Sequence, residues 1–214
     1  AYFKKFYSDK DAIIVYFGVS LNAINLRYDT VDGINVRIFI TGFTFNNVST
    51  EEPYLRYVYT GSPYGDITKT LNEFRNYHLE HPLAPDVDAV VLITGIDMCE
   101  MKGRPLCNYQ GMAFVAGACT WLKYGVCEDQ PRSYSVVRPL AHELAHILGC
   151  VHDGEPEYRF ISGHPGAKNC PYNQGYLMTY KQGSLNEYRF SPCCSKQIQF
   201  VAKLKESTCL FYNN

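Results

Sequence analysis

Three histidines in the second half of the chain are spaced as ligands of a single metal ion. His142 and His146 are four residues apart, so on a helix their imidazoles project from one face, about one turn from each other. Two imidazoles at that separation can share one zinc ion. A continuous helix would turn His152 away from this face, but Gly149 can adopt a positive φ and let the chain fold back. The spacing therefore predicts one zinc ion bound by His142, His146 and His152.

Glu143 is the candidate general base of this site. Three neutral imidazoles leave the fourth zinc position to water, which is the catalytic pattern and not the structural one. Glu143 directly follows His142 and cannot easily bind the same ion, but it can accept a proton from a water molecule that the metal activates. The alternative is a core helix whose histidines are only hydrogen-bonded. Gly149, His152 and Asp153 at fixed spacing favour the metal site over that alternative.

The elements that must position these residues are indicated by hydrophobic periodicity. Apolar residues recur every three to four positions in four segments, which predicts helices over Asp11–Leu26, Asp66–His81, Ser135–Leu148 and Ser195–Lys205. Alternating or continuous apolar runs predict strands over Ile34–Phe45, Val87–Thr94, Gly111–Ala116 and Tyr124–Glu128. Val87–Thr94 is expected to be a buried central strand, and Ile96–Gln110 to be a polar loop. The order of the elements predicts a layered α/β fold.

The extended motif over residues 142–153 resembles that of the metzincin peptidases. Asp153, directly after the third histidine, is similar to the reprolysin branch, which includes the adamalysin and ADAM-type enzymes. The segment Tyr176–Tyr180 resembles the family's Met-turn and makes Met178 the turn residue beneath the zinc. The segment Gly111–Cys119 resembles the edge strand that reprolysins present to substrate. The adjacent Cys193 and Cys194 and the turn Leu177–Tyr180 look most like those of arachnid salivary or venom reprolysins.

The resemblance implies a fold and an activity. The fold is an α/β metzincin-type zinc protease fold, with a twisted mixed sheet, an antiparallel edge strand and an active-site helix ending at a Gly turn. A loop-rich C-terminal subdomain carries the Met-turn and a terminal helix. One catalytic domain is expected over residues 1–214, divided into subdomains 1–152 and 153–214. The implied activity is secreted, extracellular endopeptidase cleavage of extracellular or plasma proteins, with substrate extended along Met112, Ala113, Phe114 and Val115.

Two further metal-related roles follow from the resemblance. Tyr180 lies two residues after Met178, where astacins carry a tyrosine that reaches the zinc, so it is a candidate phenolic donor to the oxyanion. The alternative for Tyr180 is a packed aromatic side chain. Some reprolysins also bind structural calcium, for which Asp88 and Asn213 are candidate ligands, although the short segment before Asp11 leaves little room for the family's first strand.

Two rival readings stay open. The first is a non-cleaving binding protein built on a metzincin scaffold, against which the intact Glu143 and the complete histidine set argue. The second is an astacin-like peptidase, favoured by Tyr180 and disfavoured by Asp153.

The cysteine content indicates the secretory route. There are nine cysteines in 214 residues, none of them before Cys99, which is usual for a secreted chain whose second half is cross-linked. Cys99 and Cys107 are eight residues apart and can close a small loop. The family resemblance implies a Cys119–Cys209 bond. We expect the remaining bonds to join Cys150 and Cys170 to Cys193 and Cys194, in a pairing that the sequence leaves open.

One cysteine and one asparagine complete the covalent predictions. Cys127 is left over and is read as a buried small residue, with an intermolecular bridge as the alternative. Asn47-Val48-Ser49 is an acceptor for N-glycosylation.

Composition limits the remaining possibilities. With 46% hydrophobic and 19% charged residues, the chain is globular and not intrinsically disordered. A net charge of -1 gives no electrostatic basis for binding nucleic acid or anionic membranes. The longest apolar runs, such as Ala89–Thr94, are too short to span a bilayer. No nucleic-acid partner and no membrane insertion are therefore expected. The resemblance implies protein or peptide substrates as partners, and we expect a monomer.

Overall fold

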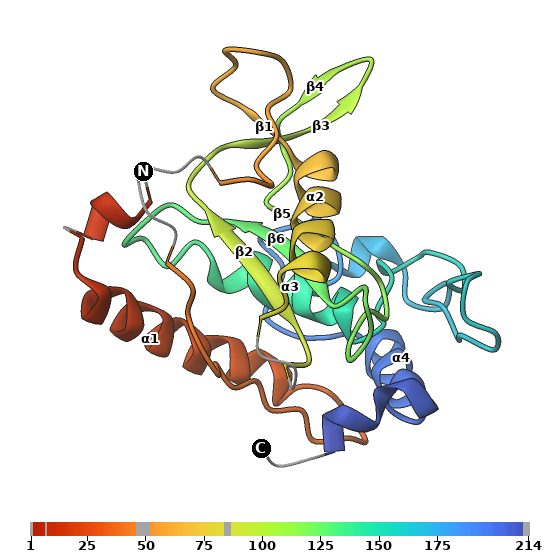
Figure 1. The fold of residues 1–214 in the computed structure, drawn as a ribbon. Coiled ribbons are helices and arrows are strands. Elements are labelled where there is room, and N and C mark those ends of the chain that lie inside the picture. The colour runs from red at the N-terminus through yellow and green to blue at the C-terminus, as the bar shows by residue number, and fades with distance from the viewer. Residues whose placement is uncertain (1, 7, 46–51, 84–86, 212–214) are drawn as a thin grey trace.

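The computed structural model describes residues 2–6, 8–45, 52–83 and 87–211 (Figure 1). The predicted glycosylation acceptor Asn47 and the candidate calcium ligand Asn213 lie outside these residues.

Four α-helices form close to where periodicity predicts them: α1 (Lys10–Tyr28), α2 (Ile67–Glu80), α3 (Val137–Ile147) and α4 (Pro192–Ala202). Asp9 and Asp66 cap α1 and α2 by accepting hydrogen bonds from backbone N–H groups of the first turn. The helix α4 begins three residues before its predicted start because Ser191 caps it and Pro192 fits its first turn. Short 3-10 helices cover Phe3–Phe6, Tyr172–Gln174 and Lys205–Phe211.

The sheet beside α3 is mixed and has the strand order β2-β6-β5. Its strands are β2 (Val90–Thr94), β5 (Gly111–Ala113) and β6 (Tyr124–Glu128). The strand β2 runs parallel to β6, and β5 pairs antiparallel with the other side of β6. The prediction of a central strand at Val87–Thr94 is therefore wrong for the described residues, in which β6 is central and β2 lies at an edge. An apolar run reports burial on both faces but not the position of a strand within its sheet.

A second small sheet replaces the polar loop expected at Ile96–Gln110. It has the order β1-β3-β4, formed by β1 (Gly65–Asp66), β3 (Met98–Lys102) and β4 (Arg104–Leu106). The strands β3 and β4 form a tight hairpin that projects from the body of the molecule (Figure 1). These strands are only two to five residues long, so they carry no sustained apolar alternation from which a hairpin could be predicted.

The strand predicted over Ile34–Phe45 is absent, and this segment is an extended chain without sheet pairing among the described residues. Ile34, Val36 and Ile38 alternate along it and are half-buried against the core, whereas Ile40 is exposed. The backbone N–H and C=O of Ile38 bond the side chain of Asn25 on α1, at 2.8 and 3.0 Å. The strand prediction is therefore wrong: the apolar alternation marks the side that packs on the core, but the backbone of Ile38 bonds a helix side chain and not a neighbouring strand.

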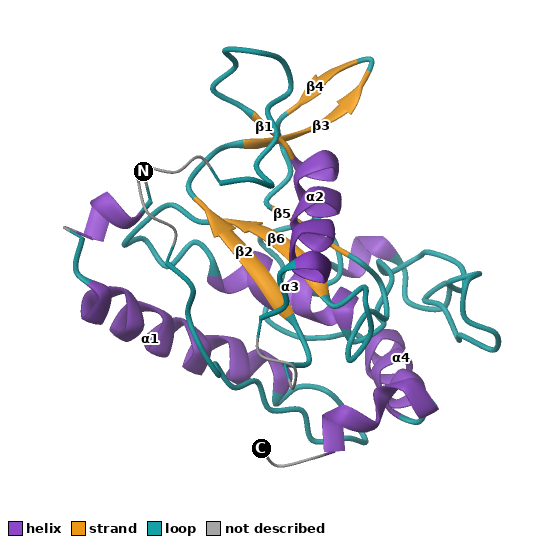
Figure 2. Cartoon of the chain, viewed as in Figure 1, coloured by secondary structure: helices purple, strands orange, loops and turns teal. Residues whose placement is uncertain are grey.

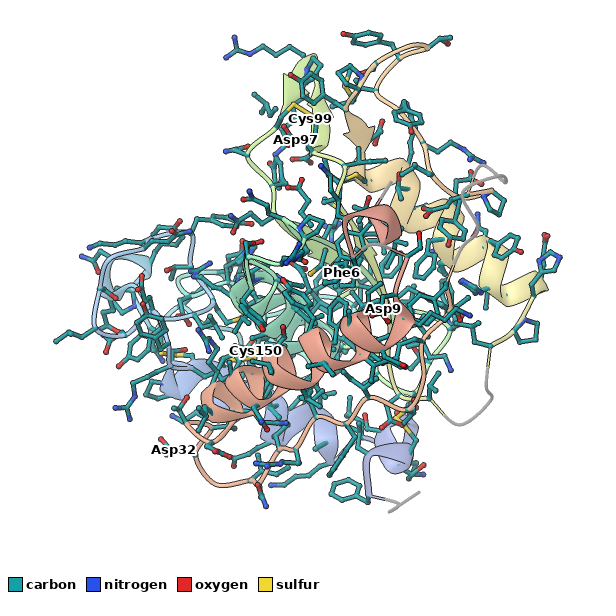
Figure 3. The ribbon with its side chains drawn as sticks, turned by 90° about the vertical axis from the view of Figure 1, so that its left-hand side faces the viewer. Phe6, Asp9, Asp32, Asp97, Cys99 and Cys150 are labelled. Carbon is teal, nitrogen blue, oxygen red and sulfur yellow. A yellow bond between two sulfur atoms is a disulfide. The ribbon has the colours of Figure 1, made fainter. Side chains whose placement is uncertain are left out.

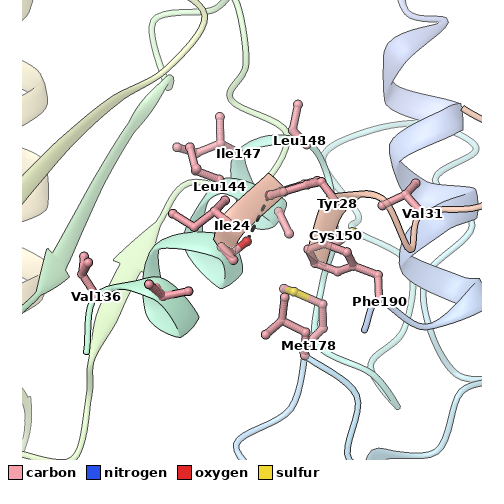
Figure 4. Packing of buried hydrophobic residues seen from close by; sticks show 14 of the residues in the cluster. Ile24, Tyr28, Val31, Val136, Leu144, Ile147, Leu148, Cys150, Met178 and Phe190 are labelled. Carbon is pink, nitrogen blue, oxygen red and sulfur yellow. Dashed lines mark hydrogen bonds between the residues drawn. The ribbon is translucent and has the colours of Figure 1, made fainter. Parts of the chain in front are cut away.

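The main hydrophobic core lies between α1, α3 and the chain after α3. Ile24 and Tyr28 of α1 pack with Leu144 and Ile147 of α3, and Met178 and Phe190 belong to the same cluster (Figure 4). The Tyr28 hydroxyl donates to the carbonyl of Ala141 at 3.0 Å, which ties the two helices together. Turned by 90°, the molecule shows α1 across its front with α3 behind it (Figure 3). This packing fixes α3, the helix that carries two of the histidines.

The segment between α3 and α4 is mostly irregular, with only the 3-10 turn Tyr172–Gln174 (Figure 2). Four disulfides cross-link the second half of the chain: Cys99–Cys107, Cys119–Cys209, Cys150–Cys194 and Cys170–Cys193. The pairing that the sequence left open is therefore fixed in the structure. Cys127 is free and buried on β6.

Candidate metal centre

The structure brings the three predicted histidines together. Candidate ligand nitrogens of His142, His146 and His152 all lie within 4.8 Å of one another. The first two project from α3 and are buried, whereas His152 is half-buried. The helix stops at Ile147, and Gly149 then adopts a φ of 112°, a left-handed value that favours glycine. The chain reverses at this point and returns His152 to the other two rings.

Backbone carbonyls select the tautomer of the two helical histidines. Nδ1 of His142 lies 2.8 Å from the carbonyl oxygen of Leu177, and Nδ1 of His146 lies 2.6 Å from that of Cys150. A carbonyl oxygen can only accept, so each Nδ1 carries the proton and each Nε2 keeps a free lone pair. Nδ1 of His152 likewise lies 3.1 Å from Oε1 of Glu155. This is the arrangement in which protein imidazoles bind metals through Nε2.

Burial favours the neutral form of the two helical imidazoles, His142 and His146. Burial lowers the pKa of His142 well below its usual value, and the nearby His146 and His152 lower it further. Burial likewise lowers the pKa of His146 to about 3, with His152 as the second cause. Neutral imidazoles with converging lone pairs are the donors that zinc prefers. The residues present therefore fit a bound zinc ion.

Glu143 lies against β5 with no partner for one oxygen. Its carboxylate is buried, and Oε2 has no hydrogen-bond partner in the described part of the chain. Burial raises its pKa well above the usual range. A Cβ on Gly111 would lie 2.6 Å from Cγ and Oε1 of Glu143, so the first residue of β5 must lack a side chain. A buried carboxylate without a partner is costly, which indicates that it interacts with a group bound at the site.

Asp153 ties the loop of the third histidine to two other segments. Its buried carboxylate accepts a hydrogen bond from the Ser191 hydroxyl at 2.5 Å, and that hydroxyl also accepts from the backbone N–H of Cys194 in α4. The backbone N–H of Asp153 donates to the carbonyl of Met178 at 3.0 Å. Met178 is itself fully buried in the main core. Asp153 therefore joins the loop of the third histidine to the segment of Met178 and to the start of α4.

Tyr180 comes close to the cluster from the segment after Met178. Its hydroxyl lies 3.0 Å from Nε2 of His152, and the two ring centroids are 4.9 Å apart. The side chain stays 58% exposed, so it borders the open side of the site. The backbone N–H of Tyr180 donates to the hydroxyl of Tyr172.

Two residues that support the site carry no motif of their own. His164 is buried, and its Nδ1 accepts from the backbone N–H groups of Tyr158 and Gly166. Its Nε2 then donates to the carbonyl of Gly149 at 2.8 Å and steadies the turn. Glu155 orients the ring of His152 through Nδ1. A carboxylate three residues after this histidine is a signal in the sequence from which the contact could have been predicted. For His164 no signal existed, because its partners are backbone atoms brought in by the fold.

The predicted substrate strand is shorter than expected. The strand β5 ends at Ala113, although the backbone N–H of Phe114 still donates to the carbonyl of Tyr124 at 3.3 Å. Ala116 has a φ of 55° and donates its N–H to the carbonyl of His146, which turns the chain onto α3. Among the described residues no strand pairs with the outer edge of β5. That edge is open to a further strand.

The Gly149 turn gives a stability prediction. A Cβ there would lie 2.4 Å from Cγ2 of Val201, and φ is positive. We expect Gly149→Ala to destabilise the protein by about 2–4 kcal/mol and lower Tm by roughly 6–12 °C. Differential scanning calorimetry measures this. Gly183→Ala is the matched control, because Gly183 has a φ of 82° with open space around it and should lose only about 1 kcal/mol. Equal losses in both variants would contradict the steric argument.

Comparisons with known proteins agree on one group. Residues 1–191 match the reprolysin model of metallo-peptidase family M12. The chain is 32% identical to the venom metalloproteinase antarease-like TserMP_B of Tityus serrulatus, over 98% of this chain and 92% of that protein. It is 33% identical to antarease-like TtrivMP_A of Tityus trivittatus, over 98% of this chain and 55% of that protein.

Two further matches are more partial. A Bombyx mori protein described as "A disintegrin and metalloproteinase with thrombospondin motifs like" is 31% identical over 92% of this chain and 29% of its own length. The chain thus spans about half or less of this relative and of the Tityus trivittatus protein. A solved structure titled "Structure of a chaperone-substrate complex" has a TM-score of 0.52 at 12% identity, over 96% of this chain and 32% of that one, which shows likeness of fold alone.

Proposed function

Since the chain belongs to the reprolysins of metallo-peptidase family M12, we propose that it is a secreted zinc endopeptidase acting on extracellular proteins with Glu143 as general base. The observation that carries the proposal is the meeting of three imidazoles beside a buried carboxylate that has one oxygen without a partner. We also propose that residues 1–214 form one catalytic domain, whose subdomains 1–152 and 153–214 meet at the histidines.

Three imidazole nitrogens support zinc as the metal of this site. His142, His146 and His152 would hold zinc through Nε2, with Nδ1 of each ring bound to an oxygen acceptor behind it. When bound, zinc supplies a Lewis acid that polarises the scissile carbonyl and makes water nucleophilic at neutral pH. Asp153, Met178 and the Gly149 turn keep the rings in place.

Glu143 moves the proton in this proposal. Its unpartnered Oε2 accepts a proton from the attacking water molecule and then delivers that proton to the leaving amine nitrogen. Burial alone raises the pKa of Glu143, but the base must start ionised, and the positive charge of a zinc ion bound at the histidines would favour that ionised form. The absence of a side chain at Gly111 keeps the carboxylate free to do this.

The substrate is proposed to lie along the open edge of β5. An extended peptide would pair antiparallel with Met112, Ala113, Phe114 and Val115 through main-chain hydrogen bonds. Such pairing fixes the backbone of any sequence and places the scissile bond beside Glu143, which lies against the first residue of β5.

Secretion is supported by the covalent structure. Four disulfides are typical of an oxidising compartment, and the Tityus relatives are described as venom proteins. No helix in the described part of the chain has the length and apolar character needed to cross a bilayer. Glycosylation of Asn47 and a calcium site at Asp88 stay predictions. One buried oxygen of Asp88 has no hydrogen-bond partner in the described structure.

The proposal is tested by cleavage of a peptide library, with products identified by mass spectrometry. We expect cuts that disappear with a zinc chelator and return with added zinc. The control is the Glu143→Gln protein purified in parallel, which excludes a contaminating protease. Binding to library peptides without any cleavage would instead support the alternative, a binding protein on the same scaffold.

Tyr180 is proposed as a donor to the oxyanion. Because its hydroxyl already lies 3.0 Å from His152, Tyr180→Phe should lower kcat by about 10-fold and leave KM nearly unchanged. Steady-state kinetics on one fluorogenic peptide measures this. Tyr188→Phe, at an exposed tyrosine, serves as the matched control and should keep full activity. An unchanged kcat in Tyr180→Phe would leave this residue only a packing role.

A further inference from the structure

The face of α2 that looks onto the substrate edge carries an arginine held between two aromatic rings. The guanidinium carbon of Arg75 lies 5.2 Å from the ring centroid of Phe114 and 5.2 Å from that of Trp121. Its Nε and one terminal nitrogen donate to the side chain of Asn76 at 3.2 and 2.9 Å. These contacts hold the charge in one place without neutralising it.

No acidic side chain pairs with Arg75 among the described residues. The nearby Glu73 of α2 instead pairs with Arg56 at 3.1 Å. Trp121 is 59% exposed, so this position is open to solvent. An oriented guanidinium without a carboxylate partner is suited to bind a carboxylate supplied from outside.

The direction of the side chains along β5 and the residue that follows it shows which part of a bound substrate would meet the guanidinium of Arg75. Met112 and Phe114 project from the same side of the strand, because successive side chains alternate. That side faces α2, since Thr68 contacts the Met112 sulfur at 3.8 Å and Arg75 contacts Phe114. Thr68 and Arg75 are seven residues apart, which places them on one face of the helix.

An antiparallel substrate runs against the numbering of β5. The substrate residue opposite Gly111 lies beside Glu143, at the reacting centre. The residue opposite Phe114 therefore precedes it by about three positions, on the N-terminal side of the scissile bond. Residues directly opposite each other on paired strands project from the same face of the sheet. The substrate side chain opposite Phe114 therefore points toward α2 and Arg75.

We propose that Arg75, held between Phe114 and Trp121, forms a subsite for an acidic side chain about three residues N-terminal to the scissile bond. The inference rests on the proposed peptidase function and adds a substrate class to it. The carboxylate would bind the guanidinium from the open side, and the two aromatic rings would orient that guanidinium. Arg75 is thereby a specificity-determining residue and takes no part in the chemical step.

The test uses matched fluorogenic peptides built on one cleavage site found with the library. Glu is moved through the four positions before the cut, and at each position it is compared with Gln and with Lys. For the wild-type protein, kcat/KM should be about 5- to 10-fold higher for Glu than for Gln near the third position, and lowest for Lys. Raising the salt from about 50 to 500 mM should shrink this preference, because the pair is partly exposed.

Three variants make the assignment specific. Arg75→Gln should remove the preference for Glu over Gln, and Arg75→Glu should reverse it toward Lys. Arg104→Glu makes the same charge change on the exposed hairpin strand β4 and should keep the wild-type preference. Circular dichroism and Tm confirm that each variant is folded.

The outcomes separate this inference from the proposed function. A wild-type protein that cuts the peptides without preferring Glu, or whose preference survives in Arg75→Gln, overturns the subsite and leaves the peptidase intact. A wild-type protein that cuts no peptide overturns the peptidase proposal and the subsite with it.

Discussion

Glu143→Gln is expected to lower kcat/KM by about 10³-fold or more while the protein still binds one zinc ion. Gln keeps the size and shape of the side chain, so it fits beneath Gly111, where a Cβ would already come within 2.6 Å of Glu143. It cannot accept a proton, so the attacking water would have no base. Activity on a fluorogenic peptide and zinc content by mass spectrometry measure the two effects separately.

The matched control for this variant is Glu157→Gln. Glu157 lies on the same loop-rich segment as the third histidine, but it is exposed and interacts with Lys168. It should retain wild-type activity and zinc content. Full activity in Glu143→Gln would show that another group removes the proton, whereas loss of zinc would show that Glu143 acts by holding the metal site together.

Removing the metal is expected to abolish activity and to lower Tm by roughly 10 °C. Without a shared ion, His142, His146 and His152 present three lone pairs to one another at a buried centre. An ion present at about 1,000 times its dissociation constant stabilises the folded state by about 4 kcal/mol, and each kcal/mol is worth about 2–4 °C for a chain of this size. The four disulfides should keep the apo-protein from unfolding outright.

The measurement is a thermal scan of the protein with and without a zinc-selective chelator, followed by addition of zinc, magnesium or calcium. Zinc alone should restore both Tm and activity. His146→Gln should show the low Tm without any chelator. An unchanged Tm and activity in the chelator would contradict the metal site. A separate loss of Tm with a calcium-selective chelator would support the calcium site predicted at Asp88.

The parts of the fold that could be predicted are those recorded by local spacing. Helical periodicity located α1 to α4 to within a few residues, because apolar residues recur at helical spacing in each, although α3 is buried on all sides over Ala141–Ile147. The histidine cluster was predictable for the same reason: a four-residue step and a glycine are local facts. Cys127 of β6 was expected to be buried because its neighbours in the sequence, such as Tyr124 and Val126, are apolar.

The errors concern partners distant in sequence. The segment Ile34–Phe45 alternates as a strand does, but its inner side packs on α1 and Asn25 takes its backbone bonds. The strands of the β3–β4 hairpin, five and three residues long, are too short to leave a pattern. The support that His164 gives to Gly149 depends on backbone atoms, which have the same chemistry in every residue.

The cysteine next to the glycine turn joins two properties of the molecule. The backbone carbonyl of Cys150 accepts a hydrogen bond from Nδ1 of His146. The sulfur of Cys150 is bonded to Cys194 at the start of α4, next to the Cys170–Cys193 bond. The orientation of one metal ligand is thus anchored covalently to a distant helix. Closing this cross-link and orienting the imidazole of His146 are therefore coupled, so we expect the metal centre to be fully ordered only after the chain has passed through an oxidising compartment.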